Sequence, residues 1–282
     1  MFDHLIVPVD MSSASMNAIP IASRLADAVA GEVQVMAVVD RVGDVPATRS
    51  ALRDAIDAFD RLEVAPEYVV DASHTVSGAI ARRLEATDGG MVLMSSHGHG
   101  RSAALLGSTV DEVLRSTFGP VIVIGPNAKP AAVALDGNYV VPLDGSSRSD
   151  SVLPIVAAWA VEFGGTPWLI EVLEQAPPPS ADVFESSFVH TRATRMARQI
   201  GREVEFEVLH GSHPARLITE FAESRDASLI FMATHGRTGL DRLRCGSVAA
   251  DVIRRAHCPV VAFRPPELAA GSDHPVAMSG AL

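Results

Sequence analysis

The stretch that decides the fold spans residues 91–126 and reads MVLMSSHGHGRSAALLGSTVDEVLRSTFGPVIVIGP. An apolar run is followed by a loop rich in glycine and hydroxyl residues, a helical pattern and a second apolar run. Residues 229–265 repeat this order as LIFMATHGRTGLDRLRCGSVAADVIRRAHCPVVAFRP. A second related pair, HLIVPVDMSS at 4–13 and YVVPLDGSS at 139–147, precedes it, and equivalent residues lie 134–139 positions apart. The chain is therefore an internal duplication.

Within each copy, short apolar runs rich in β-branched residues alternate with helical patterns. In the first copy we expect strands near 4–9, 32–39, 67–70, 91–94 and 121–125, and helices near 13–30, 48–62, 76–84 and 108–116. In the second we expect strands near 139–143, 166–173, 203–209, 229–233 and 260–263, and helices near 150–163, 182–200, 214–223 and 247–256. This alternation predicts an α/β fold of two tandem doubly wound, Rossmann-like domains, each with a five-stranded parallel sheet.

The duplication also predicts the domain boundaries. The first domain is expected at 1–128 and the second at 138–266, and the intervening residues 129–137 have the composition of a linker. Residues 267–282 show no periodicity and are expected to form a flexible tail.

Composition excludes several classes of function. The net charge of −11 argues against a non-specific nucleic-acid binder. Lys129 is the only lysine, which excludes a P-loop lysine and Schiff-base chemistry. Cys245 and Cys258 show no CxxC spacing, so a disulfide framework or zinc site is disfavoured and a reducing cytoplasmic setting is expected. No apolar run approaches 18 residues, so no membrane span or secretion signal is predicted.

The repeated loop has the chemistry of an anion site. Gly98 and Gly236 follow the fourth strand of each copy, where a missing Cβ lets the main chain approach a ligand. The next helix opens on Gly107-Ser108 in one copy and on Gly246-Ser247 in the other, so amides, a hydroxyl and the positive helix end converge. An ordinary helix N-cap is the alternative for each pair, but its recurrence at matching places favours the anion site.

Two further positions fall at carboxyl ends of strands, where open parallel sheets bind ligands. Asp10 and Asp144 follow the first strand of each copy, and either carboxylate could accept hydrogen bonds from a ribose or an adenine amine, or could cap the next helix. Val38 and Val172 end the second strands, where only backbone could contribute.

The residues give no pattern for a metal or a catalytic group. His97, His99 and His235 lie in the loops without further ligands nearby in sequence, so a polar lining role is expected. Ser96-His97 is a pair of neighbours on an extended segment, whose side chains are expected on opposite faces, so no nucleophile–base pair and no catalytic residue is predicted.

The chain resembles a tandem universal stress protein over both halves. That family carries an ATP-binding pattern, G-x2-G-x9-G-[ST], after the fourth strand. The second copy runs from Ala233 through Gly236 and nine residues to Gly246-Ser247-Val248, and the first runs from Ser95 through Gly98 and eight residues to Gly107-Ser108-Thr109. The VPVD and VPLD segments also match.

The resemblance implies a strand order of 3-2-1-4-5 in each domain, with the two fifth strands paired antiparallel so that one chain imitates a homodimer. It also implies adenosine contacts from the aspartates, adenine contacts from the valine backbones and phosphate contacts from the glycine loops. The expected nucleotide-binding residues are Asp10, Val38, Ser95, Gly98, Gly107, Ser108 and Thr109 in the first domain, and Asp144, Val172, Ala233, Gly236, Gly246, Ser247 and Val248 in the second.

This sequence departs from the family pattern in two ways. Ser95 and Ala233 replace the leading glycine, and the first loop is one residue short. One residue spans up to about 3.5 Å, enough to misplace an amide, so the second domain is the better expected ATP site.

The expected function is a cytoplasmic stress-response protein that binds ATP, with or without Mg²⁺, with at most slow hydrolysis. The expected partners are the adenine nucleotide and an unidentified regulatory protein, with no nucleic acid and no membrane. Further dimerisation of the chain stays open. The alternatives are a nucleotide-free protein–protein scaffold and an enzyme that uses ATP.

Overall fold

The computed structural model describes residues 3–97, 106–117, 119–129, 134–174, 187–234 and 245–264. The first half contains β1 (His4–Pro8), α1 (Ser13–Met16), α2 (Ala18–Ala28), β2 (Glu32–Val39), the 3₁₀ turn η1 (Val42–Asp44), α3 (Val45–Asp57), β3 (Glu67–Ala72), α4 (Val76–Glu85), β4 (Gly90–Ser95), α5 (Ser108–Ser116) and β5 (Pro120–Ile124). The second half contains β6 (Asn138–Leu143), α6 (Ser147–Asp150), α7 (Leu153–Phe163), β7 (Thr166–Leu173), α8 (Ser187–Ile200), β8 (Glu205–His210), α9 (Pro214–Ser224), β9 (Ala227–Ala233), α10 (Ser247–Arg255) and β10 (Val260–Phe263).

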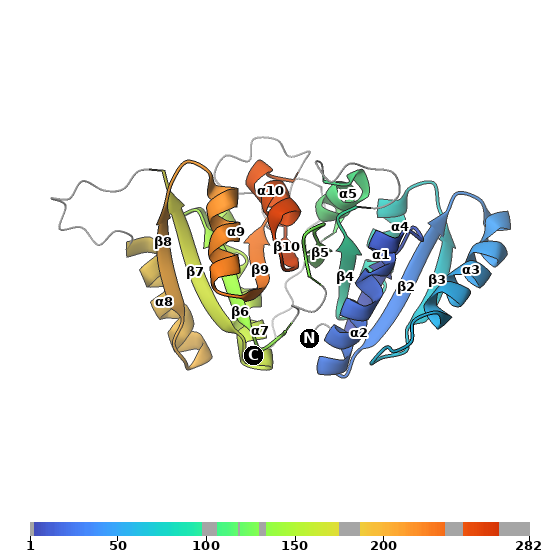
Figure 1. Ribbon diagram of the computed structural model, residues 1–282, viewed down its shortest axis with the longest axis horizontal. Coiled ribbons are helices and arrows are strands. Elements are labelled where there is room, and N and C mark those ends of the chain that lie inside the picture. The colour runs from blue at the N-terminus through green and yellow to red at the C-terminus, as the bar shows by residue number, and fades with distance from the viewer. Residues whose placement is uncertain are drawn as a thin grey trace.

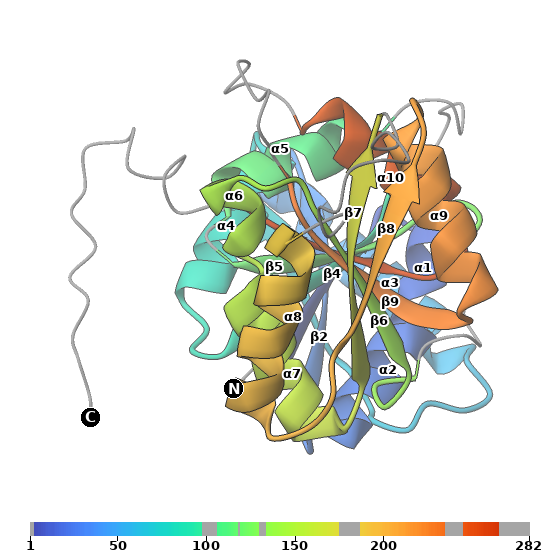
Figure 2. The same cartoon turned by 90° about the vertical axis from the view of Figure 1, so that its left-hand side faces the viewer.

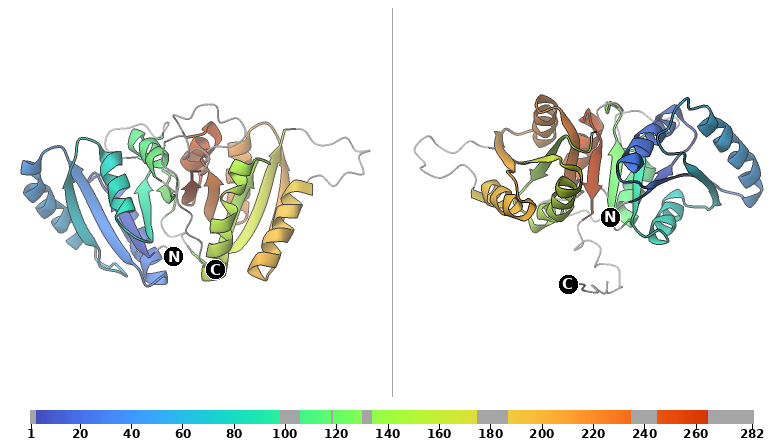
Figure 3. Two further views of the ribbon diagram at one scale, coloured as in Figure 1. Left: turned by 180° about the vertical axis from the view of Figure 1, so that it is seen from behind. Right: turned by 90° about the horizontal axis from the view of Figure 1, so that it is seen from below.

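All ten strands belong to one sheet, in the order β3-β2-β1-β4-β5-β10-β9-β6-β7-β8. Numbered within its own half, each set of five strands has the order 3-2-1-4-5, and its pairings are parallel. β5 and β10 pair antiparallel, with Val123 opposite Val260. The expected fold class is therefore confirmed, and the two sheets are continuous. Figures 1 and 3 show the halves as two lobes that meet at this junction.

Helices cover both faces of the sheet. One buried cluster joins α2 and α3 of the first half with α7 and α8 of the second, through residues such as Leu25, Leu52 and Trp159. The other lies under α4, α5, α9 and α10, through residues such as Ile80 and Ile253. Figure 2 shows β7 and β8 between α8 on one side and α9 on the other. Each cluster runs through both halves, so the core does not stop at the junction.

Two long helices that the sequence pattern predicted are each divided. The structure has α1 and α2 in place of one helix over 13–30, and α6 and α7 in place of one over 150–163. Pro20 and Pro154 explain both breaks, because a proline lacks the N–H that would bond to the carbonyl four residues earlier. Those carbonyls belong to Met16 and Asp150, the last residues of α1 and α6.

The helix predicted over 48–62 is displaced. α3 begins at Val45, with Pro46 in its first turn, and ends at Asp57. The following residues pack irregularly on the core, since the Val64 N–H donates to Ser23 Oγ at 2.8 Å and Leu62 lies against the buried cluster. The predicted start of the helix at 182 and the predicted tail at 267–282 lie outside the described residues.

Candidate functional site

The first half carries a cavity at the carboxyl ends of β1, β2 and β4. Its volume is about 240 Å³. Six of the seven nucleotide-binding residues expected in this half line it: Asp10, Val38, Ser95, Gly107, Ser108 and Thr109. The seventh, Gly98, lies outside the described residues. Residues from four different elements thus converge on one space, as the topology of an open parallel sheet requires.

Asp10 anchors the turn between β1 and α1. Its Oδ1 accepts hydrogen bonds from the Ser12 N–H at 3.1 Å, from Ser12 Oγ at 2.5 Å and from Ser15 Oγ at 2.7 Å. The N-cap of α1 is Ser12 and not Asp10, because Ser12 Oγ accepts from the Ser15 N–H. The capping alternative for Asp10 is therefore wrong, and the carboxylate organises the turn from the exposed edge of the cavity.

The second half repeats this turn. The Ser146 N–H and Ser146 Oγ donate to Asp144 Oδ1 at 3.0 and 2.6 Å. The Asp144 N–H donates to Ser149 Oγ at 3.3 Å, as the Asp10 N–H does to Ser15 Oγ at 3.2 Å. Both turns follow the pattern D-x-S-S-x-S, in DMSSAS at 10–15 and DGSSRS at 144–149. This repeated spacing signals the buried serines Ser15 and Ser149, which hydrogen-bond to the aspartate N–H groups. These two serines were not identified from the sequence.

The glycine loops close in the same way in both halves. The Gly107 N–H donates to the Ser96 carbonyl at 3.1 Å, and the Gly246 N–H donates to the Thr234 carbonyl at 2.8 Å. Gly107 is the N-cap of α5, with φ −60° and ψ 140°, and Gly246 is the N-cap of α10, with φ −56° and ψ 143°. The shorter first loop therefore does not displace the helix entry, so the expected shift of these amides is wrong.

A glycine at the N-cap leaves the first turn of each helix without a side-chain cap. The N–H groups of a first turn have no intrahelical partner, and the helix dipole is positive there. In the first half this helix end lies beside the cavity, because Gly107, Ser108 and Thr109 all line it. The arrangement can hold an anion, and the carboxylate of Asp10, which lines the same cavity, can select polar groups.

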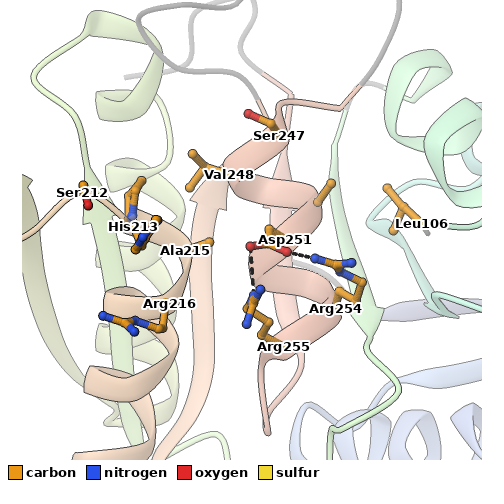
Figure 4. A pocket seen from close by; sticks show the side chains of 12 residues that line it. Leu106, Ser212, His213, Ala215, Arg216, Ser247, Val248, Asp251, Arg254 and Arg255 are labelled. Atoms are coloured by element: carbon orange, nitrogen blue, oxygen red, sulfur yellow. Dashed lines mark hydrogen bonds and ion pairs between the residues drawn. The ribbon is translucent and has the colours of Figure 1, made fainter. Parts of the chain in front are cut away.

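The remaining expected residues of the second half occupy the equivalent elements. Val172 lies in β7, Ala233 is the last residue of β9, and Ser247 and Val248 begin α10. Gly236 lies outside the described residues. Ser247 and Val248 line a groove of about 630 Å³ between α9 and α10, which Figure 4 shows, and Asp144, Val172 and Ala233 are not among the residues that line it.

His97 corrects one expectation. Ser96 Oγ and His97 Nδ1 lie 2.7 Å apart, so the two side chains meet and do not point to opposite faces. The strand alternation fails here because β4 ends at Ser95 and the next residue begins a bend. Ser96 is fully buried, although it belongs to the lining of the cavity. His97 lines the cavity, and its buried Nε2 has no hydrogen-bond partner among the described residues.

The two thiols are not poised for chemistry. Burial raises the pKa of Cys245 to about 12, with a further contribution from Asp111, and burial raises the pKa of Cys258 to about 12. Both therefore stay protonated at neutral pH, whereas nucleophiles and metal ligands are thiolates. Among the described residues, no group of three His, Cys, Asp or Glu side chains is placed to hold a metal ion.

One residue of the first half supports the loop of the second. Asp111 Oδ1, from α5, accepts a hydrogen bond from the Cys245 N–H at 2.8 Å. Cys245 directly precedes Gly246, the N-cap of α10. α5 and α10 lie side by side at the junction, as Figure 1 shows. Nothing in a single copy of the repeat predicts this contact, because it joins the two copies.

Comparisons with known proteins agree with this architecture. The sequence model of the Universal stress protein family matches residues 1–125 and again 137–264. A universal stress protein of Methanocaldococcus jannaschii is 35% identical over 45% of this chain and 82% of its own. One from Mycobacterium tuberculosis is 28% identical over 75% of this chain and 72% of its own.

Solved structures agree on the fold. The crystal structure of a universal stress protein from Archaeoglobus fulgidus superimposes with a TM-score of 0.71 at 19% identity, covering 94% of this chain and 99% of that one. Two doubly wound domains with a shared sheet thus define the class. The chain belongs to the universal stress protein family, in its tandem two-domain form. Within the described residues, no helix combines the length and the apolar character needed to cross a membrane.

Proposed function

We propose that the chain binds an adenine nucleotide, ATP with or without Mg²⁺, at the carboxyl ends of its strands. The observation that carries this proposal is the convergence of six expected residues on one cavity in the first half. The exposed carboxylate of Asp10 suits a ribose or an adenine amine, and the start of α5, which has no side-chain cap, suits phosphate. The second half repeats the aspartate turn and the glycine closure with the same hydrogen bonds.

Nucleotide occupancy in this proposal acts as a signal or a stabiliser in a stress response, read by a regulatory protein partner in the cytoplasm. One observation supports a signalling role over fast catalysis, and another supports the compartment. Ser96, the hydroxyl that contacts His97, is fully buried. Both cysteines are free thiols, which suits a reducing compartment. Hydrolysis, if measured, should be slow.

The second half is the stronger site in this proposal. The cavity of about 240 Å³ in the first half is smaller than pockets for small ligands, which span roughly 300–1,000 Å³. Ser247 and Val248, two of the expected residues of the second half, line a groove of about 630 Å³, which leaves room for a phosphate chain beside them. The second half also keeps the nine-residue spacing of the family pattern between Gly236 and Gly246.

A matched pair of substitutions tests the site and the preference together. Ser108 and Ser247 are exposed and each is the first residue of its helix. Glutamate at this position favours the helix dipole, so Ser108→Glu and Ser247→Glu should both fold, while each adds a charge that repels phosphate. We expect Ser247→Glu to weaken ATP binding about tenfold or more in calorimetry, and Ser108→Glu to change it little. If both variants bind ATP as tightly as the unmodified chain, the proposed nucleotide site is wrong.

The scaffold alternative makes a different prediction for the purified protein. A nucleotide-binding chain should release adenine nucleotide when it is denatured directly after purification, detectable by absorbance and mass spectrometry. A scaffold should release none and should show no heat with ATP.

A further inference from the structure

The groove between α9 and α10 carries a cluster of basic side chains. His213 and Arg216 come from the start of α9, and Arg254 and Arg255 come from the last turn of α10. Leu106, from the first half, lines the same groove on the far side of α10 in Figure 4. Asp251 is the only carboxylate among its described lining residues, and Glu220 on α9 lies 3.6 Å from Arg216 Nε, so three guanidinium groups stand against two carboxylates there.

In the first half, the equivalent helices α4 and α5 are joined by a hydrogen bond across the line where they meet. There, Ser77 Oγ on α4 donates to Glu112 Oε2 on α5 at 3.0 Å and ties the two helices together. Counted from the first residue of each helix, the equivalent residues of the second half are Ala215 and Asp251. Alanine has no hydroxyl to donate, and Asp251 turns instead to the arginines of its own helix. The second half therefore has no counterpart of the hydrogen bond between Ser77 and Glu112.

The basic residues are also particular to the second half. By the same count, Arg216 and Arg255 stand where the first half has Gly78 and Ser116. Arg254 matches Arg115. Two arginines have thus been added beside the groove, and Glu220, which stands where the first half has Arg82, pairs with one of them.

Asp251 pairs with Arg254 and Arg255 and leaves part of each guanidinium group exposed to solvent. It is in contact with Arg254 Nη2, and Arg255 Nε lies 2.9 Å from its second oxygen, as the dashed lines of Figure 4 mark. Arg255 and Arg216 retain 47% and 58% of their side-chain exposure, so an anion from solvent can reach both. A guanidinium has five N–H donors, more than one carboxylate uses.

The distance along α10 from Ser247 to Arg255 indicates how long a bound anion must be. Ser247 begins α10, and Arg254 and Arg255 lie seven and eight residues later, a rise of about 10–12 Å along the helix. The helix start at one end and the guanidinium groups at the other both favour phosphate. A single phosphate cannot span this path, and a long polyanion would meet the net charge of −11 outside the groove.

We propose that the α9–α10 groove is a binding site for a short chain of condensed phosphates, lying along α10 from Ser247 to Arg255. The chain has two sources, a free inorganic polyphosphate or the phosphates of a bound nucleotide. The site for the free chain does not depend on the proposed nucleotide function.

The test compares Arg216→Gln/Arg255→Gln with a control of equal charge, Arg195→Gln/Arg198→Gln. The control residues are exposed on α8, on the opposite face of the sheet. All four positions are exposed, so both variants should melt close to the unmodified chain. Each protein is titrated by calorimetry with sodium tripolyphosphate, with ATP and with AMP at low ionic strength, where exposed charges are least screened.

A free chain predicts that the groove variant binds tripolyphosphate about tenfold more weakly than the control, with ATP and AMP unchanged. A nucleotide-borne chain predicts the same loss for ATP and none for AMP, which has a single phosphate. Tripolyphosphate and ATP binding that are equal in the groove variant and the control would overturn the proposal. That result would leave the nucleotide proposal standing if ATP still binds, so the two failures are distinguishable.

Discussion

At the scale of single residues, the turn after each aspartate requires a left-handed backbone. Gly145 has φ +83° and Met11, its counterpart, has φ 65°. This conformation places the Ser12 and Ser146 N–H groups against the carboxylates of Asp10 and Asp144. The site therefore depends on backbone geometry that only glycine adopts without strain.

Gly145→Ala isolates that backbone cost, because no atom lies within 4 Å of the Cβ it would add. We expect it to lower the free energy of unfolding by about 1 kcal/mol in urea denaturation. Gly43→Ala is the control, since its Cβ also meets no atom within 4 Å and its φ is not left-handed. A loss in Gly43→Ala as large as in Gly145→Ala would show that the backbone conformation is not the cause.

At the scale of secondary-structure elements, α10 is hydrogen-bonded to the first half near both of its ends. Asp111 Oδ1 accepts the Cys245 N–H, and Asn127 Nδ2 donates to the Arg254 carbonyl at 3.2 Å. The loop that leads into the second glycine site is thus supported by the first half.

Asp111→Ala should free the Cys245 amide, since an unpaired N–H in a partly buried place costs about 1–3 kcal/mol. We expect hydrogen exchange of the peptide containing Cys245 to accelerate about tenfold, measured by mass spectrometry. Asp111→Asn keeps an acceptor oxygen while losing the contact with Arg115, so it should exchange like the unmodified chain. Fast exchange in both variants would assign the effect to the lost charge.

The elements also show what sequence patterns can and cannot give. The strands and glycine loops were predictable because burial on both faces demands apolar runs and the repeat supplied every landmark twice. The breaks before α2 and α7 were not, although Pro20 and Pro154 signal them, because helical periodicity continues across each break. The contacts of Val76 with the cavity, and of Asp111 with Cys245, depend on tertiary packing and left no local signal.

At the scale of the whole molecule, the shared sheet and the two continuous cores couple the halves. Gly125, just after β5, approaches the backbone of Ile253 on α10 so closely that a Cβ would collide with it. We expect the two halves to unfold together. Trp159 and Trp168 are the only tryptophans and both lie in the second half, so fluorescence reports on that half while far-UV circular dichroism reports on both.

The two signals should give the same midpoint and the same steepness in urea. Separate midpoints would show that the β5–β10 junction does not transmit stability, contrary to the continuous clusters that cross it.

The most direct test of nucleotide binding is a calorimetric titration of the natively purified, unmodified chain with ATP and Mg²⁺. The convergence of Asp10, Val38 and Gly107 on one cavity, and the repetition of the aspartate turn and the glycine closure at Asp144 and Gly246, predict saturable heat. The absence of detectable binding at millimolar ATP, in protein shown to carry no retained nucleotide, would contradict the account.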